Sequence, residues 1–361
     1  MTTHYGMIGC GMMGQEHLRN IALLDDTSVS VIFEPDVDMA KIAAGFAPDA
    51  TFVDSIDALL AHTPLDCLVI ASPNFRHVEQ LERIAASVSL PILCEKPLYT
   101  DPADRSRIDR FMRDYSAPVW VGMEYRYMPP VAALIEQSAE ITGGIEMLTI
   151  QEHRFPFLPK VGDWNRHNAY SGGTLVEKCC HFFDLMRHIL RAEPVRVMAS
   201  AGQAVNHLDE VYDGKPSDIW DHGYVIVDFD SGARAMLELS MFAEGSKFQE
   251  TITAIGKTGK IECAVPGSKH FWPAELGEPP VAELRISPRT RKGMRIEAMP
   301  LDTRLAEAGG HYGSTYYENA RFLEVVRGER EVEVTLADGA KAVAMGLAAQ
   351  ESARTGQAVT L

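Results

Sequence analysis

Long apolar segments and an excess of positive charge are both missing from this sequence. None of its uninterrupted apolar runs approaches the roughly 20 residues needed to span a bilayer. The N-terminus lacks the basic start and the apolar run of a signal peptide. The 34 basic residues are outnumbered by 50 acidic ones, which disfavours nucleic acid and anionic membranes as partners. These absences predict a soluble, cytoplasmic metabolic protein that acts on a small molecule.

Cysteine is scarce, and its positions suit neither a disulfide framework nor a zinc site. The six cysteines are scattered, and only Cys179 and Cys180 are adjacent, so we expect reduced thiols in a chain of this size. Cys179, Cys180 and His181 would share one helical turn, where they are poorly placed to bind one metal together. Internal repeats and low-complexity tracts are also missing. We therefore expect no structural metal.

A glycine-rich turn stands near the start of the chain. Gly9, Gly11 and Gly14 form a G-x-G-x-x-G pattern between an apolar segment, residues 5–8, and a helical pattern, residues 15–24. The order of strand, tight turn and helix suits a pyrophosphate, because the backbone can approach the anion closely and the helix presents free N–H groups to it. The pattern by itself is also compatible with an ordinary glycine turn.

The second apolar segment gives this turn its context. Residues 28–33 end at Glu34, whose carboxylate can accept hydrogen bonds from an adenosine ribose and would repel a 2′-phosphate. The next three residues, 35–37, include no lysine or arginine that could receive such a phosphate. The pattern therefore favours NAD over NADP, and the alternative for Glu34 is a solvated carboxylate at the end of a strand.

Strands and helices then alternate as in a doubly wound parallel sheet, through residue 123. Two buried strands are expected at residues 66–71 and 91–94, and ligands of such sheets bind beyond the carboxyl ends of the strands. The polar residues that follow these two strands are Ser72, Asn74, His77, Glu95 and Lys96. Helix capping is the alternative role for the serine and the asparagine.

After residue 123 the pattern changes to strands with few helices between them. The expected strands are residues 148–153, 195–201, 224–229, 233–241, 250–255 and 260–264. Glycine-containing turns at 230–232 and 256–259 predict hairpins and hence a largely antiparallel sheet. Apolar residues occupy both faces of residues 233–241, which predicts a homo-oligomer formed through the open face. We assign residues 1–123 to a cofactor domain and residues 124–361 to an α+β domain for substrate binding and oligomerisation.

One stretch of the second half carries acid–base chemistry. If residues 175–190 form one helix, Glu177, His181 and Asp184 lie one turn apart on the same face. A carboxylate and an imidazole so placed can form a proton relay, since histidine titrates near neutral pH. A purely structural hydrogen bond to His181 explains the spacing equally well.

Several motifs together resemble the Gfo/Idh/MocA oxidoreductase family, over nearly the whole chain. They are Gly9-x-Gly11-x-x-Gly14, Ser72-Pro-Asn74 with His77, Glu95-Lys96-Pro97, Gly172-Gly173 before a carboxylate-x-x-x-His-x-x-Asp pattern, Gly256-Lys-Thr-Gly-Lys-Ile-Glu262 and Ser352-Ala-Arg-Thr-Gly356. The resemblance implies an NAD(P)-dependent enzyme for sugars, inositols or related polyols. It also implies a Rossmann domain, an open-faced antiparallel sheet, and dimers or tetramers.

Carried over position by position, the resemblance implies that Lys96 and His181 are catalytic and that Glu177 stands where the family usually has aspartate. Arg126 and Trp164 match positions that border the substrate or the nicotinamide. The cofactor contacts expected from the motifs are Gly9, Gly11, Met12, Met13, Gly14, Glu34, Ser72, Asn74, His77, Glu95 and Lys96.

The sequence departs from the family pattern around its histidine. The usual Asp-x-Gly-x-His reads Glu177-Lys178-Cys179-Cys180-His181 here, so the carboxylate is one methylene longer and a glycine is lost. Lys178 adds a cation that we expect to contact the substrate. The basic residues Arg154, Lys160, Arg166 and Lys178 predict either an anionic substrate or merely solvated side chains.

Three functions follow from this resemblance. The first is NAD-dependent oxidation of a secondary hydroxyl on a sugar, inositol or related polyol. The second is glycoside cleavage by transient oxidation, elimination and re-reduction, with no net NADH and with an anionic sugar as a possible substrate. The third is a sensor that binds the cofactor without turnover, against which the presence of Lys96 and His181 argues.

Overall fold

The computed structural model describes residues 1–290 and 293–361, which form two compact units. Unit 1 comprises residues 1–124, 159–172 and 315–343, and unit 2 comprises residues 125–158, 173–314 and 344–361. The chain therefore returns twice to unit 1 after first leaving it. Within the described ranges, no helix is both long enough and apolar enough to cross a membrane.

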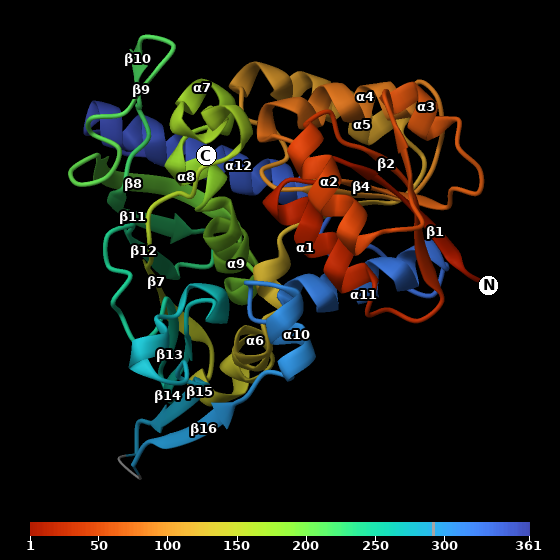
Figure 1. Ribbon diagram of the computed structural model, residues 1–361. Helices are drawn as coiled ribbons and strands as arrows, with labels where there is room; N and C mark the ends of the chain where they lie inside the picture. Colours follow the sequence, from red (N-terminus) through yellow and green to blue (C-terminus); the bar gives the residue numbers. More distant parts are fainter. Residues whose placement is uncertain (291–292) are drawn as a thin grey trace. The chain divides into compact units, whose positions relative to one another are not determined.

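Unit 1 is built on a six-stranded parallel sheet in the order β3-β2-β1-β4-β5-β6 (Figure 1). Its strands are β1 (Thr3–Ile8), β2 (Thr27–Phe33), β3 (Thr51–Val53), β4 (Cys67–Ile70), β5 (Ile92–Glu95) and β6 (Val119–Gly122). The central strands are buried almost throughout, as expected for a parallel sheet that helices cover on both faces.

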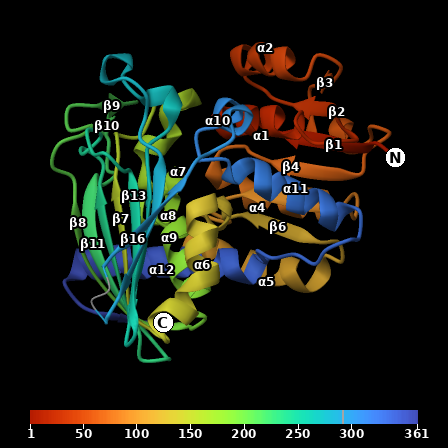
Figure 2. The same cartoon turned by 90° about the horizontal axis from the view of Figure 1, so that it is seen from below.

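Helices connect the consecutive strands of unit 1, and two further helices, α7 and α11, come from its later segments. They are α1 (Met12–Ile21), α2 (Val37–Phe46), α3 (Ile56–Leu60), α4 (His77–Ala85), α5 (Arg105–Asp114), α7 (Asn168–Ser171) and α11 (Ser314–Val326). The strand order reverses direction at β1, so right-handed crossovers place α1 and α2 on one face and α4 and α5 on the other (Figure 2). The reversal lies between β1 and β4, and such a switch point is where open α/β sheets bind their ligands.

Unit 2 contains a nine-stranded sheet in the order β16-β15-β14-β13-β7-β12-β11-β8-β17. The strands are β7 (Ile145–His153), β8 (Pro194–Gly202), β11 (His222–Phe229), β12 (Arg234–Ser240), β13 (Glu250–Gly256), β14 (Gly259–Val265), β15 (Ala282–Pro288), β16 (Arg295–Met299) and β17 (Val359–Thr360). A separate hairpin consists of β9 (Val211–Tyr212) and β10 (Lys215–Pro216). All ladders of the large sheet are antiparallel except the one between β7 and β12.

Helices cover one face of this sheet and leave the other face open (Figure 2). The helices of unit 2 are α6 (Pro129–Thr142), α8 (Thr174–Glu177), α9 (Cys180–Leu190) and α10 (Thr303–Ala308), while α12 (Leu336–Thr355) runs from one unit into the other. On β11, Val225 and Val227 are buried, whereas Tyr224 and Ile226 on the opposite face are 55% and 40% exposed. The predicted fold class, a Rossmann sheet followed by an open-faced and mainly antiparallel sheet, is confirmed.

Candidate active site

The glycine turn of unit 1 has the geometry of a phosphate cradle. Gly9 has φ +90°, and a Cβ there would lie 2.6 Å from the backbone of Ser72. A Cβ on Gly14 would lie 2.4 Å from the carbonyl oxygen of Gly9, so the helix and the turn pack too closely for a larger residue. A Cβ on Gly11 would meet nothing within 4 Å, which leaves room beside the first turn of α1. A dinucleotide pyrophosphate fits this arrangement of open space and free N–H groups.

The carboxylate of Glu34 lies against this same turn. One of its oxygens accepts a hydrogen bond from the backbone N–H of Cys10 at 2.5 Å, and the other accepts one from the backbone N–H of Asp36 at 2.8 Å. The side chain at the tip of β2 is thereby fixed beside the glycines. Met12, which is 46% exposed, and Met13 occupy the first turn of α1, which begins three residues earlier than the sequence pattern indicated.

The residues after β4 form a closely bonded loop. Ser72 Oγ donates to Gln80 at 2.6 Å, and the amide of buried Asn74 lies 3.4 Å from the carbonyl oxygen of Ser171. The ring of His77 is fully buried, with its two nitrogens 2.9 Å and 3.1 Å from the carbonyl oxygens of Pro97 and Ser72. Burial lowers the pKa of His77. His77 therefore ties the loop after β4 to the loop that carries Lys96.

Glu95, at the end of β5, is held by a buried histidine. Its Oε1 lies 2.8 Å from His17 Nε2, and its Oε2 accepts a hydrogen bond from the backbone N–H of Lys96 at 3.1 Å. Burial would raise the pKa of Glu95, but the hydrogen bond and charge of His17, together with the charge of Lys96, outweigh burial and lower it. An ionised Glu95 thus fixes the backbone from which half-buried Lys96 projects.

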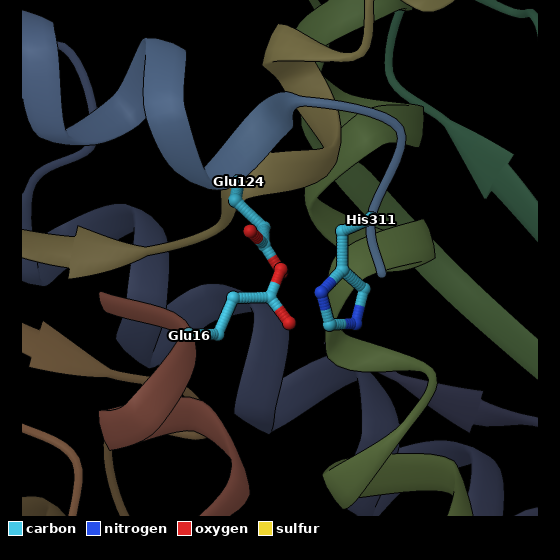
Figure 3. Close-up of side chains that lie close together, drawn as sticks. All are labelled: Glu16, Glu124 and His311. Carbon is cyan, nitrogen blue, oxygen red and sulfur yellow. The ribbon is translucent and has the colours of Figure 1, made fainter. Parts of the chain in front are cut away.

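Two further carboxylates surround His17. Glu16 and Glu124 point toward one another (Figure 3), and their oxygens lie 2.8 Å and 2.5 Å from the hydroxyl of Thr315. Burial tends to lower the pKa of His17, but Glu95, Glu124 and Glu16 raise it above its ordinary value. These three carboxylates favour the protonated form of His17, which ties the base of the loop that carries Lys96 through Glu95.

Trp164 belongs to unit 1, although it lies far along the chain. It lies in a 3-10 segment, Val161–Arg166, and packs edge-on against Phe75 with ring centroids 6.3 Å apart. Lys160 places its ammonium 4.4 Å from the centre of the Trp164 ring. Trp164 is therefore next to the segment of unit 1 that carries Ser72 and Asn74.

His181, on α9 of unit 2, is held by an aromatic neighbour. The rings of His181 and Tyr125 stack in parallel, with centroids 4.1 Å apart and an interplanar angle of 7°. Only 3% of His181 is exposed. Tyr125 belongs to a 3-10 turn, Glu124–Tyr127, and no motif in the sequence marks it, in contrast to its neighbour Arg126.

Arg126 forms a buried ion pair within unit 2. Its guanidinium donates two hydrogen bonds to Asp184, at 2.6 Å and 2.5 Å, and both side chains are at most 5% exposed. Asp184 lies three residues after His181 on α9. The pair therefore fixes the helix that carries His181 to the turn that carries Tyr125.

Lys178 is buried in a charged network of unit 2. Its ammonium donates to the hydroxyl of Tyr125 at 2.5 Å and lies 2.8 Å from a carboxylate oxygen of Glu152. Arg154 adds a second cation, 3.9 Å from the same oxygen. Burial lowers the pKa of Lys178, and the charge of Arg154 adds to this effect against that of Glu152. Two of the four basic residues noted in the sequence, Lys178 and Arg154, meet in this network, and the other two, Lys160 and Arg166, belong to unit 1.

Glu177 does not lie on one continuous helix with His181. Helix α8 ends at Glu177 and α9 begins at Cys180, so the helix predicted over residues 175–190 is divided. A Cβ on Gly346 would lie 2.5 Å from the carbonyl oxygen of Leu175, which shows how closely α12 approaches α8. His181 and Asp184 remain together on α9, while the buried carboxylate of Glu177 precedes the break.

The fold and these side chains define a class of protein, a dinucleotide-dependent oxidoreductase with a Rossmann unit and a separate sheet unit. Residues 3–123 match the oxidoreductase family, NAD-binding Rossmann fold, and residues 138–361 match the oxidoreductase family, C-terminal alpha/beta domain. The chain therefore belongs to the Gfo/Idh/MocA oxidoreductase family. Its first unit is an NAD-binding domain, which confirms the prediction of NAD as cofactor.

Known proteins resemble the chain over most of its length. It is 29% identical to inositol 2-dehydrogenase of Rhizobium meliloti (strain 1021) over 263 residues, which cover 72% of this chain and 75% of that protein. The structure of a levoglucosan dehydrogenase in complex with NADH and levoglucosan has a TM-score of 0.81 at 20% identity, covering 100% and 99% of the two chains. A myo-inositol dehydrogenase from Corynebacterium glutamicum has a TM-score of 0.76 at 23% identity, covering 100% and 99%. At these identities the two solved structures show the shared fold.

Proposed function

We propose that the protein oxidises a secondary hydroxyl of a sugar, inositol or related polyol. The family membership supports an oxidoreductase, and the names of its relatives, an inositol 2-dehydrogenase and a levoglucosan dehydrogenase, support a polyhydroxylated substrate. The observation that carries the proposal is the buried imidazole of His181, stacked on Tyr125, in a chain that also fixes Lys96 beside an ionised Glu95.

The roles of the side chains follow from their chemistry. His181 takes the hydroxyl proton, because an imidazole titrates near neutral pH and can later return the proton. Lys96 stabilises the developing alkoxide with its ammonium. Bound NAD would supply the acceptor for the hydride that leaves the carbinol carbon. Glu177 and Asp184 stand on either side of His181 in the sequence, and Asp184 positions α9 through its pair with Arg126.

The cofactor contacts that we propose divide into two groups. Gly9, Gly11, Gly14, Met12 and Met13 surround the pyrophosphate, and Glu34 binds the adenosine ribose. Ser72, Asn74, Glu95 and Lys96 extend the site along the ends of β4 and β5. His77 acts through the backbone of these loops, because its ring is bound to two of their carbonyl groups.

The substrate contacts are a separate proposal. Trp164 and Arg126 are proposed to border the substrate, Trp164 with its ring and Arg126 with its guanidinium. Lys178 is proposed to act on the substrate through Tyr125, to which its ammonium is bonded. If Lys178 instead contacts the substrate directly, Tyr125→Phe should leave the KM for the substrate unchanged.

Homo-oligomerisation is proposed through the open face of the sheet in unit 2. Met198 and Ile226 are cross-strand neighbours on β8 and β11, with 38% and 40% of their surfaces exposed, and Tyr224 adds a larger exposed ring. Apolar side chains that lie together on a sheet face favour contact with a second copy of the chain. A dimer or a tetramer covers them, and light scattering of the wild type against an Ile226→Glu variant measures the effect.

The experiment that tests the function is a substrate screen with two readouts. The purified protein is incubated with NAD and with a panel of inositols, hexoses and glycosides, and both NADH and released aglycone are measured. A dehydrogenase accumulates NADH in proportion to oxidised product. Release of aglycone without net NADH would identify the redox-neutral glycoside cleavage instead, and NAD binding without any turnover would identify a sensor.

A further inference from the structure

A hollow of about 350 Å³ lies in unit 2, beside the end of β7. Arg154, Phe155 and Phe157 line it from the segment after β7, and Phe271 and Trp272 line it from the segment after β14. Gln249, just before β13, also lines it. All of these residues belong to unit 2, so the hollow is formed within one compact unit.

Aromatic rings form much of its wall. Phe155 and Phe271 lie with their centroids 4.8 Å apart at 50°, and Phe271 is 51% exposed. The indole N–H of Trp272 donates to the carbonyl oxygen of Gly277 at 2.9 Å, which fixes the ring. Aromatic side chains with open faces favour a planar ring as ligand, because offset and edge-to-face contacts both become possible.

Arg154 adds a positive charge to this aromatic wall. Its guanidinium carbon lies 4.7 Å from the centre of the Phe155 ring and 5.9 Å from that of Phe157, and 13% of the side chain is exposed. Among residues 1–290 and 293–361, none accepts a hydrogen bond from its buried Nε. A guanidinium presents several donors in one plane and matches the two oxygens of a carboxylate.

The charges beneath Arg154 leave it incompletely neutralised. Arg154 and Lys178 share one buried carboxylate, Glu152. A second buried carboxyl, Glu250, has its pKa raised to about 7 by burial and by the charge of Glu152, so near neutral pH it supplies only part of a negative charge. Glu244, also on the lining, is exposed at the rim. Arg154 therefore shares its nearest carboxylate with Lys178, and its guanidinium on the lining can attract an anion.

We propose that this hollow binds a small aromatic carboxylate, with its ring against Phe155, Phe271 and Trp272 and its carboxylate on the guanidinium of Arg154. The second step of the proposal, which rests on the proposed function, is that this aromatic carboxylate is a substituent of the substrate. A continuous set of contacts supports that step, since Arg154 adjoins Glu152, Glu152 pairs with Lys178, and Lys178 is bonded to Tyr125, on which His181 stacks. The preferred substrate is then a polyol or glycoside that carries an aromatic acid.

Calorimetric binding to the full chain tests the site itself. The ligands are benzoate, benzamide, which lacks the charge, and acetate, which lacks the ring. We expect benzoate to bind about tenfold or more tightly than either of the others, because it alone makes both the ring contact and the charge-assisted hydrogen bonds. Equal affinities for benzoate and acetate, or the absence of saturable benzoate binding, overturn the proposal.

Two variants locate the binding. Arg154→Met is expected to weaken benzoate binding about tenfold or more, since the methionine keeps the apolar stem and loses the donors. The matched control is Arg234→Met, because Arg234 is an arginine of the same sheet whose side chain is 70% exposed and which does not line the hollow. Phe271→Ala changes an exposed side chain, so it is expected to fold, and it should weaken benzoate while leaving acetate unaffected. Unchanged benzoate affinity in both variants places the ligand elsewhere and refutes the assignment.

Turnover tests the second step separately. The rate of NAD reduction is compared for the glucoside of 4-hydroxybenzoate and for methyl glucoside, in the wild type and in Arg154→Met. The expected result is a kcat/KM advantage for the aromatic acid that falls about tenfold or more in the variant. Equal kcat/KM for the two substrates overturns the second step. If neither substrate nor any other polyol reduces NAD, the proposed function fails, whereas the calorimetric result on benzoate still decides the binding site.

Discussion

The two units hold their functional groups in different ways. Unit 1 forms its proposed cofactor cradle from the main chain, with glycines at Gly9, Gly11 and Gly14 and a carboxylate, Glu34, held by backbone N–H groups. Unit 2 holds His181 against the side chain of Tyr125. A local backbone motif leaves a signature in the sequence, because its spacing is set by a few consecutive residues. A network of side chains does not.

The residues around His181 illustrate this difference. Tyr125 comes from a 3-10 turn, Glu152 from β7, Lys178 from the break between α8 and α9, and Glu250 from β13. Each is separated from the next by more than twenty residues of sequence. Folding collects them, and burial then changes their acidity, since the pKa of Lys178 falls while that of Glu250 rises.

The largest expected effect is on catalysis, and it tests the roles proposed for Lys96 of unit 1 and His181 of unit 2. Lys96→Met and His181→Asn should each lower kcat on the order of 10²-fold or more while His181→Asn preserves NAD affinity, because each loses a group that acts in the transition state. Steady-state kinetics and NAD titration measure this. The matched controls are the exposed residues Lys41 and His270, changed in the same way. Normal turnover in both Lys96→Met and His181→Asn would contradict the assigned roles.

A smaller effect distinguishes Gly11 from Gly14, two glycines of the turn in unit 1. Gly11→Ala should reduce NAD affinity about tenfold with little change in Tm, since the added Cβ meets no protein atom but occupies space that the pyrophosphate needs. Gly14→Ala should lower both the NAD affinity and the Tm, because its Cβ overlaps the carbonyl of Gly9. We expect the free energy of unfolding to fall by roughly 1–3 kcal/mol. Gly45→Ala is the control, as its Cβ meets nothing and α2 takes no part in the turn. Equal melting temperatures for the Gly11 and Gly14 variants would refute this distinction.

The smallest expected effect is on the way in which stability depends on pH through Glu250 of unit 2. The pKa of Glu250 is raised to about 7, by burial first and by the charge of Glu152 second. Between about pH 4.5 and 7 the folded state therefore keeps a proton that the unfolded chain releases, and stability falls as pH rises, by at most about 1.4 kcal/mol per pH unit. Glu250→Gln should remove this slope in denaturant unfolding, whereas Glu331→Gln, at an exposed position, should retain it. A slope identical in wild type and Glu250→Gln would show that Glu250 is not its source.

Much of the fold could be predicted because the periodicities of apolar residues that mark strands and helices depend on neighbours along the chain. The alternation of strand and helix identified the parallel sheet, and the strands at residues 148–153 and 250–255 were recovered in β7 and β13. Strands β15 and β16 were not predicted, since their sequences lie among polar residues and prolines. The parallel ladder between β7 and β12 was also not predicted, because pairing direction depends on the path of the chain through the whole sheet.

The sequence alone therefore determined the strand–turn–helix at Gly9, the acidic residue after β2 and the family, since each depends on residues that are neighbours along the chain. Only the tertiary structure decided that residues 159–172 and 315–343 join unit 1, that Arg126 pairs with Asp184, and that Lys178 is buried beside Glu152. Such contacts join side chains from distant segments, and their partners are chosen by packing and by the cost of leaving a buried charge unpaired.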